Sequence, residues 1–280
     1  MMMMKNIVLV FLFFLVILVS AQTPLVIMHT NDTHSQLEPY GADEGYDSGL
    51  GGIVRREAII RTIRQTEPNV LVFEAGDFVQ GTPFFNLFKG EAEIELMNFL
   101  GLDAVTLGNH EFDNGIDALA VILKKANFPI VCTNYDVSSS VLKDLVKPWI
   151  VLKRGGLRVG VVSANIDLKG KSMTSNYEGL VYQDPLTTVD ARAGWLKKNK
   201  KCDVVICLSH LGLEYEDGKT DDVTLAVKSR NIDVIIGGHT HSFLKEPILK
   251  QNLNGDSVLI SQMGKGGVYI GRLDLLFELK

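Results

Sequence analysis

Apolar runs alternate with amphipathic segments through the first half of the chain. Short runs rich in Val, Ile, Leu and Phe predict buried strands, and apolar residues that recur every three or four positions predict helices. The predicted strands are 25–28, 69–73, 103–107 and 128–133, and the predicted helices are 53–65, 91–100 and 116–126. Strands that alternate with helices in this way are typical of α/β domains.

Hairpins join this alternation in the second half. Residues 149–164 predict a hairpin that turns at Gly155-Gly156, and Asn254-Gly255 marks another. Asp184-Pro185 predicts the start of a helix that runs to about Lys200, with Asp as N-cap and Pro at the first helical position. Further strands are expected at 203–209, 233–237 and 267–279, and a helix at 221–231. The pattern predicts one α/β domain with two mixed sheets and flanking helices, since no Pro-, Gly- or Ser-rich linker and no repeat interrupts it.

The first 21 residues have the pattern of a secretory signal peptide. Lys5 supplies the positive charge, Asn6–Val19 is an almost purely apolar run, and Val19-Ser20-Ala21 offers small residues for cleavage after Ala21. The alternative is an uncleaved membrane anchor, although the apolar run is short for a full span. We expect an exported protein, periplasmic or extracellular, with no stable membrane span after cleavage.

Charge and cysteine content narrow the classes of function. The net charge is −5, and it becomes −6 when the signal segment takes Lys5 with it. An acidic chain without a Lys/Arg block is a poor binder of nucleic acid polymers. Cys132, Cys202 and Cys207 lie in apolar, strand-like stretches, so we expect buried free thiols rather than a disulfide framework.

Potential metal ligands follow five of the predicted strands. In open α/β sheets, sites form beyond the carboxyl ends of the strands, so these side chains are expected to converge on one edge. Each cluster alone is a weak signal. If all of these residues had only structural roles, however, their positions after five strands would be five separate coincidences. The predicted ligands are Asp32, His34, Asp77, Asn109, His210, His239 and His241.

The ligand types indicate two divalent metal ions. Histidine nitrogens and carboxylates without thiolates suit Zn, Mn, Fe or Co rather than a closed structural zinc site. Seven ligands are too many for one tetrahedral ion but suit two ions that share a carboxylate. Such a pair, roughly 3.5–4 Å apart, activates a water molecule and neutralises phosphate oxygens during hydrolysis.

Residues near these ligands have separate predicted roles. His110 and Asp113 are three positions apart past a strand, where a carboxylate-held histidine can protonate a leaving oxygen or stabilise transition-state charge. For Glu111 we expect an internal hydrogen-bond acceptor, and for His29 a packed structural histidine. Three glycines are expected to let the backbone pass close to the metals. They are Gly76, Gly108 and Gly238.

Five motifs together resemble the 5′-nucleotidase branch of the calcineurin-like metallophosphoesterases. They are "LVIMHTNDTHSQL" at 25–37, "GD" at 76–77, "LGNHEFD" at 107–113, "SHLG" at 209–212 and "GGHTH" at 237–241. The resemblance implies a four-layer α/β/β/α sandwich over residues 22–280 and attack by a metal-activated hydroxide on phosphomonoesters, with nucleoside 5′-monophosphates as the first expectation. It implies Asp32, His34 and His241 on one metal, Asn109, His210 and His239 on the other, and Asp77 as the bridge. It also implies the transition-state role for His110 and the orientation of that ring by Asp113.

The sequence departs from the family pattern in its length. Full-length relatives carry a C-terminal substrate-binding domain, which is expected to be absent here and to come from a separate partner protein. A smaller departure is Leu102, where the family pattern has an aromatic residue. Three alternatives stay open: hydrolysis of 2′,3′-cyclic nucleotides, hydrolysis of other phosphodiesters or sulfur esters, and a non-catalytic metal-binding module. Intact His110 and Asp113 argue against the last, because metal binding alone does not need them.

Overall fold

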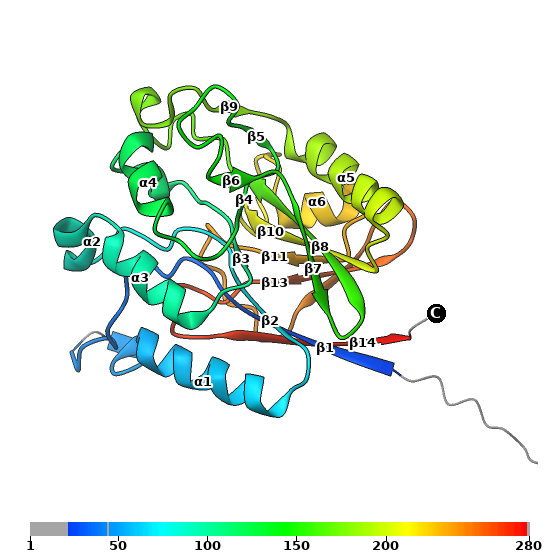
Figure 1. Ribbon diagram of the computed structural model, residues 1–280, viewed down its shortest axis with the longest axis horizontal. Coiled ribbons are helices and arrows are strands. Elements are labelled where there is room, and N and C mark those ends of the chain that lie inside the picture. Colours follow the sequence, from blue (N-terminus) through cyan, green and yellow to red (C-terminus); the bar gives the residue numbers. More distant parts are fainter. Residues whose placement is uncertain (1–21, 44, 279–280) are drawn as a thin grey trace, which may run out of the picture.

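Two six-stranded sheets form the centre of the molecule (Figure 1). The computed structural model describes residues 22–43 and 45–278, so the predicted signal segment at 1–21 lies outside the described residues. The first sheet has the order β14 (Gly271–Glu278), β1 (Gln22–Thr30), β2 (Val70–Glu74), β3 (Ala104–Val105), β4 (Ile130–Val131) and β6 (Val146–Lys147). The second has the order β12 (Ile248–Gln251), β13 (Ser257–Ser261), β11 (Val234–Ile236), β10 (Val204–His210), β8 (Leu157–Asn165) and β7 (Ile150–Arg154).

Both sheets are mixed, as the sequence predicted. In the first, β1, β2, β3, β4 and β6 are parallel and β14 is antiparallel to β1. In the second, β8, β10, β11 and β13 are parallel, and β7 and β12 form the antiparallel edges. The parallel strands of each sheet therefore end at a common edge, where loops that carry a site can meet.

The described helices cover the outer faces of the two sheets. Against the first sheet lie α1 (Ile53–Thr66), α2 (Pro83–Phe88), α3 (Glu91–Leu100) and α4 (Ile116–Leu123), and against the second lie α5 (Pro185–Trp195) and α6 (Asp222–Lys228). Between the sheets, the inner residues of β1 and β2 pack on those of β8, β10 and β11, with Ile27, Phe73 and Ile206 fully buried. The arrangement is the expected four-layer α/β/β/α sandwich.

Most predicted elements are confirmed, with differences at their ends. Asp184 caps α5 by accepting a hydrogen bond from the Thr187 N–H, and the helix continues to Lys200 as a π-helical turn. The helix predicted at 221–231 ends at Lys228 instead, since Asp190 accepts the backbone N–H groups of Arg230 and Asn231. Helix α2 and the small β5 (Tyr135–Asp136)–β9 (Val181–Tyr182) ribbon were not predicted.

The structural predictions for single residues are also confirmed. Cys132, Cys202 and Cys207 are buried free thiols. His29 is fully buried in β1, and its Nε2 lies 3.0 Å from the Ser261 hydroxyl. None of the helices within 22–43 and 45–278 has the length and apolarity needed to cross a membrane.

Candidate metal centre

Ligand-type residues from both sheets meet at the carboxyl ends of the parallel strands. Asp32 and His34 follow β1, Asp77 follows β2, His210 ends β10, and His239 and His241 follow β11. Their ligand atoms form two groups, each with all atoms within 4.8 Å of one another. The groups are Asp32, His34 and His241, and Asp77, His210 and His239.

The first group lies at the solvent side of the site. His34 Nε2 is 3.0 Å from His241 Nε2, and Asp32 Oδ1 is 3.9 Å from the first nitrogen and 3.5 Å from the second. Asp32 is fully buried, whereas His241 is partly exposed. Two imidazole nitrogens and a carboxylate oxygen therefore face one small space that is open to solvent.

The second group lies deeper. His210 is fully buried, and its Nε2 is 3.0 Å from Asp77 Oδ2 and 3.8 Å from Asp32 Oδ1. The other ring nitrogen, Nδ1, lies 2.7 Å from the Ala75 carbonyl oxygen, which fixes the ring with Nε2 toward the carboxylates. Asp32 Oδ1 therefore lies within 4 Å of histidines from both groups, so the two groups adjoin.

Asn109 provides a test of whether a cation fits. Its amide oxygen is buried and has no hydrogen-bond partner among the described residues. Buried polar atoms are almost always hydrogen-bonded, so this unpartnered acceptor needs another explanation. A divalent cation would satisfy it, and the nitrogen and oxygen donors around it match Zn, Mn, Fe or Co.

The backbone at the ligand positions is unusual. Nine non-glycine residues in the described part of the chain have positive φ, and five of them are predicted ligands. L-residues rarely adopt this left-handed conformation, which costs about 1–3 kcal/mol per position and clusters at functional sites. The five are Asp32, His34, Asp77, His239 and His241.

The three predicted glycines lie against the ligands. A Cβ on Gly108 would be 2.2 Å from Asp77 Oδ1 and 2.5 Å from His210 Nε2. A Cβ on Gly76 would be 2.6 Å from the Gly108 nitrogen, and one on Gly238 would be 2.9 Å from His210 Nδ1. Below 3.0 Å the neighbouring atoms must shift, so a side chain at these positions would displace the candidate ligands or the backbone beside them.

His110 and Asp113 form a pair beside the first group. His110 Nδ1 is 2.8 Å from Asp113 Oδ2, and the His110 ring centroid is 5.4 Å from that of His34. Both side chains are about one-third exposed, so the ring reaches the solvent-filled mouth of the site. The hydrogen bond to Asp113 raises the pKa of His110, which favours the protonated imidazole.

The carboxylates attract positive charge into the buried group. Burial by itself would lower the pKa of His210, but Asp77 and Asp32 raise it to about 10. Burial would raise the pKa of Asp77, but the charge of His210 and the hydrogen bond to it hold that pKa well below its usual range. This interior therefore favours positive charge, which a divalent cation bound there would supply in place of the proton.

Glu111 lies behind the ligands and has the predicted role of internal acceptor. Its carboxylate accepts the backbone N–H groups of Asp77, Phe78 and Gly108. Burial raises the pKa of Glu111 to about 7. These hydrogen bonds tie the loop after β2 to the loop after β3.

Two buried amides that the sequence analysis missed hold the other loops. Asn31 donates to Asp32 Oδ2 and to the Gly264 carbonyl, and it accepts the Met263 N–H. Gln262 donates to the Gly238 carbonyl and accepts from Thr240 Oγ1 and the Ser242 N–H. Asn31 directly precedes the predicted ligand Asp32, and this was the one sequence signal that could have found it. Gln262 has no predicted ligand near it in the sequence.

The fold and these clusters define the class of protein: the chain belongs to the calcineurin-like phosphoesterase family, whose model matches residues 25–243. It is 34% identical to the 5′-nucleotidase of Rattus norvegicus over 277 residues, which are 91% of this chain and 47% of that protein. The chain thus spans about half the length of the curated relatives it matches.

Solved structures agree with this assignment. The 5′-nucleotidase precursor from Thermus thermophilus superposes with a TM-score of 0.82 at 33% identity, covering 91% of this chain and 52% of that one. A calcineurin-like phosphoesterase from Bacillus subtilis superposes with a TM-score of 0.76 at 26% identity, covering 93% of this chain and 87% of that one. The matched region is therefore about half of the first solved chain and most of the second.

Proposed function

We propose that this chain is a dinuclear-metal phosphoesterase that hydrolyses phosphomonoesters, and that nucleoside 5′-monophosphates are its preferred substrates. The observation that carries the proposal is the adjacency of two ligand groups around Asp32, with the His110–Asp113 pair beside them. The relatives named 5′-nucleotidases support the substrate class.

The residues are assigned as follows in this proposal. Asp32, His34 and His241 hold one ion, Asn109, His210 and His239 hold the other, and Asp77 bridges them. The unpartnered Asn109 oxygen supports its place in the second set. When bound, two divalent ions neutralise phosphate oxygens and activate water for attack on phosphorus.

His110 supplies the remaining chemistry from the protein. Its Nδ1–H donates to Asp113, which fixes the ring and leaves Nε2 free to donate a proton or a hydrogen bond. At the exposed mouth of the site, Nε2–H stabilises charge on the phosphoryl oxygens or protonates the leaving alkoxide. Asp113 acts only through the orientation and charge of this ring.

The test combines metal analysis with a substrate panel. The protein is loaded in turn with Zn, Mn, Fe or Co, assayed for metal content, and given AMP, 2′,3′-cyclic AMP and a diester. We expect about two ions per chain and hydrolysis of AMP that a chelator abolishes.

His110→Ala is expected to lower kcat by about 10²–10⁴-fold with an unchanged metal content. Asp113→Ala is expected to lower kcat as well, because it removes the hydrogen bond that orients His110. Asp117→Ala, which removes an exposed acid on α4, is its matched control and is expected to leave kcat unchanged. Unchanged turnover in His110→Ala would refute the assigned mechanism.

Export and the participation of a second, substrate-binding domain are also part of the proposal. The N-terminal pattern supports export, and the Thermus relative is likewise described as a precursor. The relatives are about twice as long as the matched region, which motivates the second domain. Adding the C-terminal half of a relative in trans is expected to lower the KM for AMP, whereas turnover of AMP at enzyme-like rates without it would contradict this part.

A further inference from the structure

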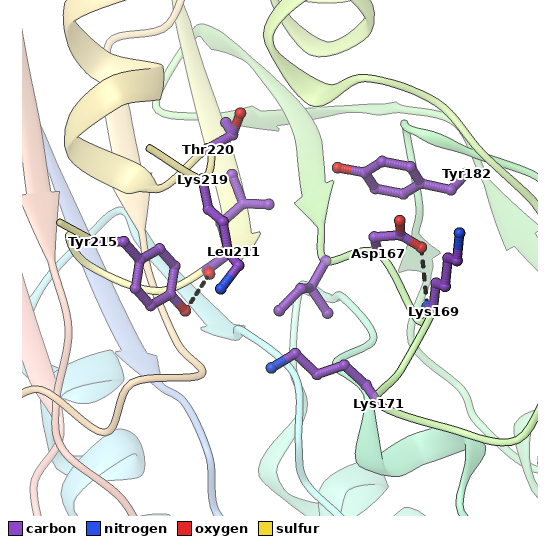
Figure 2. A pocket seen from close by; sticks show the side chains of 9 residues that line it. Asp167, Lys169, Lys171, Tyr182, Leu211, Tyr215, Lys219 and Thr220 are labelled. Carbon is purple, nitrogen blue, oxygen red and sulfur yellow. Dashed lines mark hydrogen bonds between the residues drawn. The ribbon is translucent and has the colours of Figure 1, made fainter. Parts of the chain in front are cut away.

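A cavity of about 340 Å³ lies beside the candidate metal centre and has no role in the chemistry above. Figure 2 shows Tyr182 and Tyr215 on opposite sides of it, with Leu211 between them and the Lys171 side chain extending along its edge. Its volume is in the range of small-molecule sites, which bind ligands with apolar walls and a few polar groups.

The cavity and the metal ligands share the same loops. Leu211 directly follows His210, and the next residue, Gly212, packs on Thr240, which lies between His239 and His241. On the other wall, Asn165 pairs with His210 in the sheet register, so the loop that begins at Ile166 leaves the same sheet edge. A molecule bound at the metals can therefore extend into this cavity.

The loop after β8 also reaches the His110–Asp113 pair. Asn176 donates to the Asp113 carbonyl at 3.2 Å, so the segment that carries Lys171 spans from His210 to Asp113. Lys171 lies on this segment and lines the cavity together with Leu211, the residue that follows His210.

The walls are suited to a ring, and one edge is suited to an anion. The Tyr215 hydroxyl donates to the Leu211 carbonyl, which fixes that ring, and Tyr182 packs edge-on against Tyr135. Lys171 forms no ion pair with the described residues, whereas Lys219 is paired with Asp217. An unpaired amine beside aromatic walls favours a ligand with an apolar ring and its own negative charge.

We propose that this cavity is a leaving-group subsite: the organic part of the substrate lies between Tyr182 and Tyr215, and Lys171 binds a second anionic group. The subsite would make nucleoside bisphosphates better substrates than monophosphates. This inference rests on the proposed phosphomonoesterase function. Removal of the 5′-phosphate from such a substrate leaves a nucleoside 3′-monophosphate and inorganic phosphate.

The experiment compares adenosine 3′,5′-bisphosphate with AMP. In the wild-type protein, kcat/KM is expected to be about tenfold higher for the bisphosphate, the effect of one charge-assisted contact. Lys171→Gln is expected to remove that preference while it changes kcat/KM for AMP by less than about twofold. Lys153→Gln, an exposed lysine on the far β7 edge, is the matched control and is expected to change neither value.

A second variant tests the ring. Tyr182→Leu keeps an apolar side chain on β9 and is expected to lower kcat/KM for both nucleotides about fivefold. Hydrolysis of glycerol 3-phosphate, whose leaving group has no ring, is expected to be unchanged. An equal loss for glycerol 3-phosphate would mean that Tyr182 acts on the fold or the metals, and would overturn its place in the subsite.

Binding separates this proposal from the function on which it rests. If neither nucleotide is hydrolysed, the proposed function fails, but calorimetric titration with the same two nucleotides still tests the cavity. Tighter binding of the bisphosphate that Lys171→Gln abolishes would support the subsite. Equal affinity for both nucleotides, or an equal loss of both in Lys171→Gln, would overturn it, since Lys171 would then act at the shared phosphate.

Discussion

Gly108→Ala is a one-carbon change that tests the geometry of the site. Gly108 has an ordinary negative φ, so alanine fits its backbone conformation, and the effect on the folded state comes only from the added methyl group. That Cβ would lie 2.2 Å from Asp77 Oδ1 and 2.5 Å from His210 Nε2. Carbon–oxygen contacts in proteins are about 3.3 Å or longer, so the Asp77 carboxylate must move by about 1 Å.

The consequences for activity and stability differ in size. A displacement of about 1 Å at a reacting centre lowers the rate about 10²-fold, which corresponds to about 2.7 kcal/mol. Overpacking costs about 1–3 kcal/mol of folding free energy, and the loss of glycine flexibility in the unfolded chain returns about 0.4–1 kcal/mol. We therefore expect a folded protein with a modest loss of stability and a large loss of activity.

The assay measures AMP hydrolysis, metal content and urea unfolding on the same preparations. Gly194→Ala is the control, because Gly194 lies in α5 and its added Cβ would meet only the end of the Asn231 side chain at 3.0 Å. Gly108→Ala is expected to lose at least half its bound metal, and the control is expected to lose none. Wild-type activity and metal content in Gly108→Ala would refute the assignment of Asp77 and His210 as ligands.

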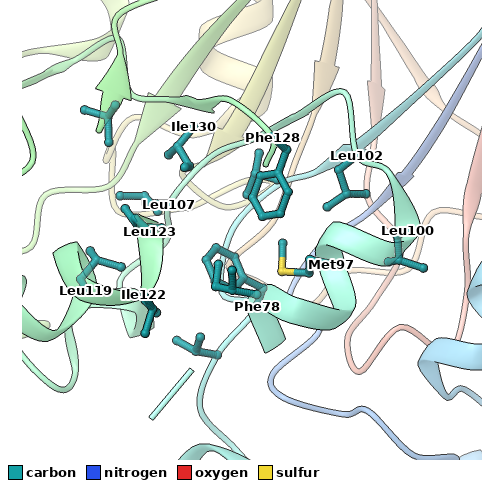
Figure 3. Packing of buried hydrophobic residues seen from close by; sticks show 14 of the residues in the cluster. Phe78, Met97, Leu100, Leu102, Leu107, Leu119, Ile122, Leu123, Phe128 and Ile130 are labelled. Atoms are coloured by element: carbon teal, nitrogen blue, oxygen red, sulfur yellow. The ribbon is translucent and has the colours of Figure 1, made fainter. Parts of the chain in front are cut away.

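Three further predictions concern residues outside the ligand set. Gln262→Ala leaves the Gly238 carbonyl and the Ser242 N–H without their buried partner, so metal affinity measured by competition with a chelator is expected to fall about 10–100-fold. Leu119 is 1% exposed and lies in the core that Figure 3 shows. Leu119→Ala is expected to lower the free energy of unfolding, measured with urea, by about 2–5 kcal/mol. Val121→Ala, at an exposed position of the same helix, is expected to lower the free energy of unfolding by less than about 0.5 kcal/mol. Equal losses in the two variants would contradict the packing argument. Burial lowers the pKa of His29 from 6.5 to about 4, so its stabilising contribution is complete above pH 6.5 and is lost as the pH falls toward 4. The loss is on the order of 3 kcal/mol at pH 4, and His29→Gln, compared by urea unfolding at pH 7 and 4, is expected to show a correspondingly weaker pH dependence.

The fold was predictable where long periodic segments set the pattern. Helix α3 was predicted at its observed bounds because Gly101 ends it with a left-handed backbone conformation. Helix α2 was missed because its six residues, Pro83–Phe88, are too few to show a helical period. The β5–β9 ribbon was missed because each strand has two residues and their pairing joins segments about 45 positions apart. Leu102, where the family pattern has an aromatic residue, is buried in the same hydrophobic cluster as Phe128 (Figure 3), so the position keeps an apolar packing role.

The residue types that meet at the candidate site were visible in the sequence, but the hydrogen bonds that hold their loops were not. Ligand-type residues follow strands, and that signal is local in the sequence. Which atoms face one another is not local: Asn31 reaches Met263 and Gly264 across more than 230 positions, and Gln262 holds the loop of His239 and His241 from the next strand of the sheet. Such contacts exist only once the sheets have formed, so no window of the sequence contains them.

The same supports explain how five ligand positions keep a strained backbone. Each left-handed residue costs about 1–3 kcal/mol, which the surrounding contacts must offset. Glu111 ties down the Asp77 loop by accepting the backbone N–H groups of Asp77, Phe78 and Val79, Asn31 holds Asp32, and both carboxylate oxygens of Asp32 accept the His239 N–H. These contacts come from side chains outside the candidate ligand groups and from the groups themselves, so the fold holds the loops in place. Ligand atoms held in this way would be preorganised for metal binding, which would reduce the free energy needed to order the loops.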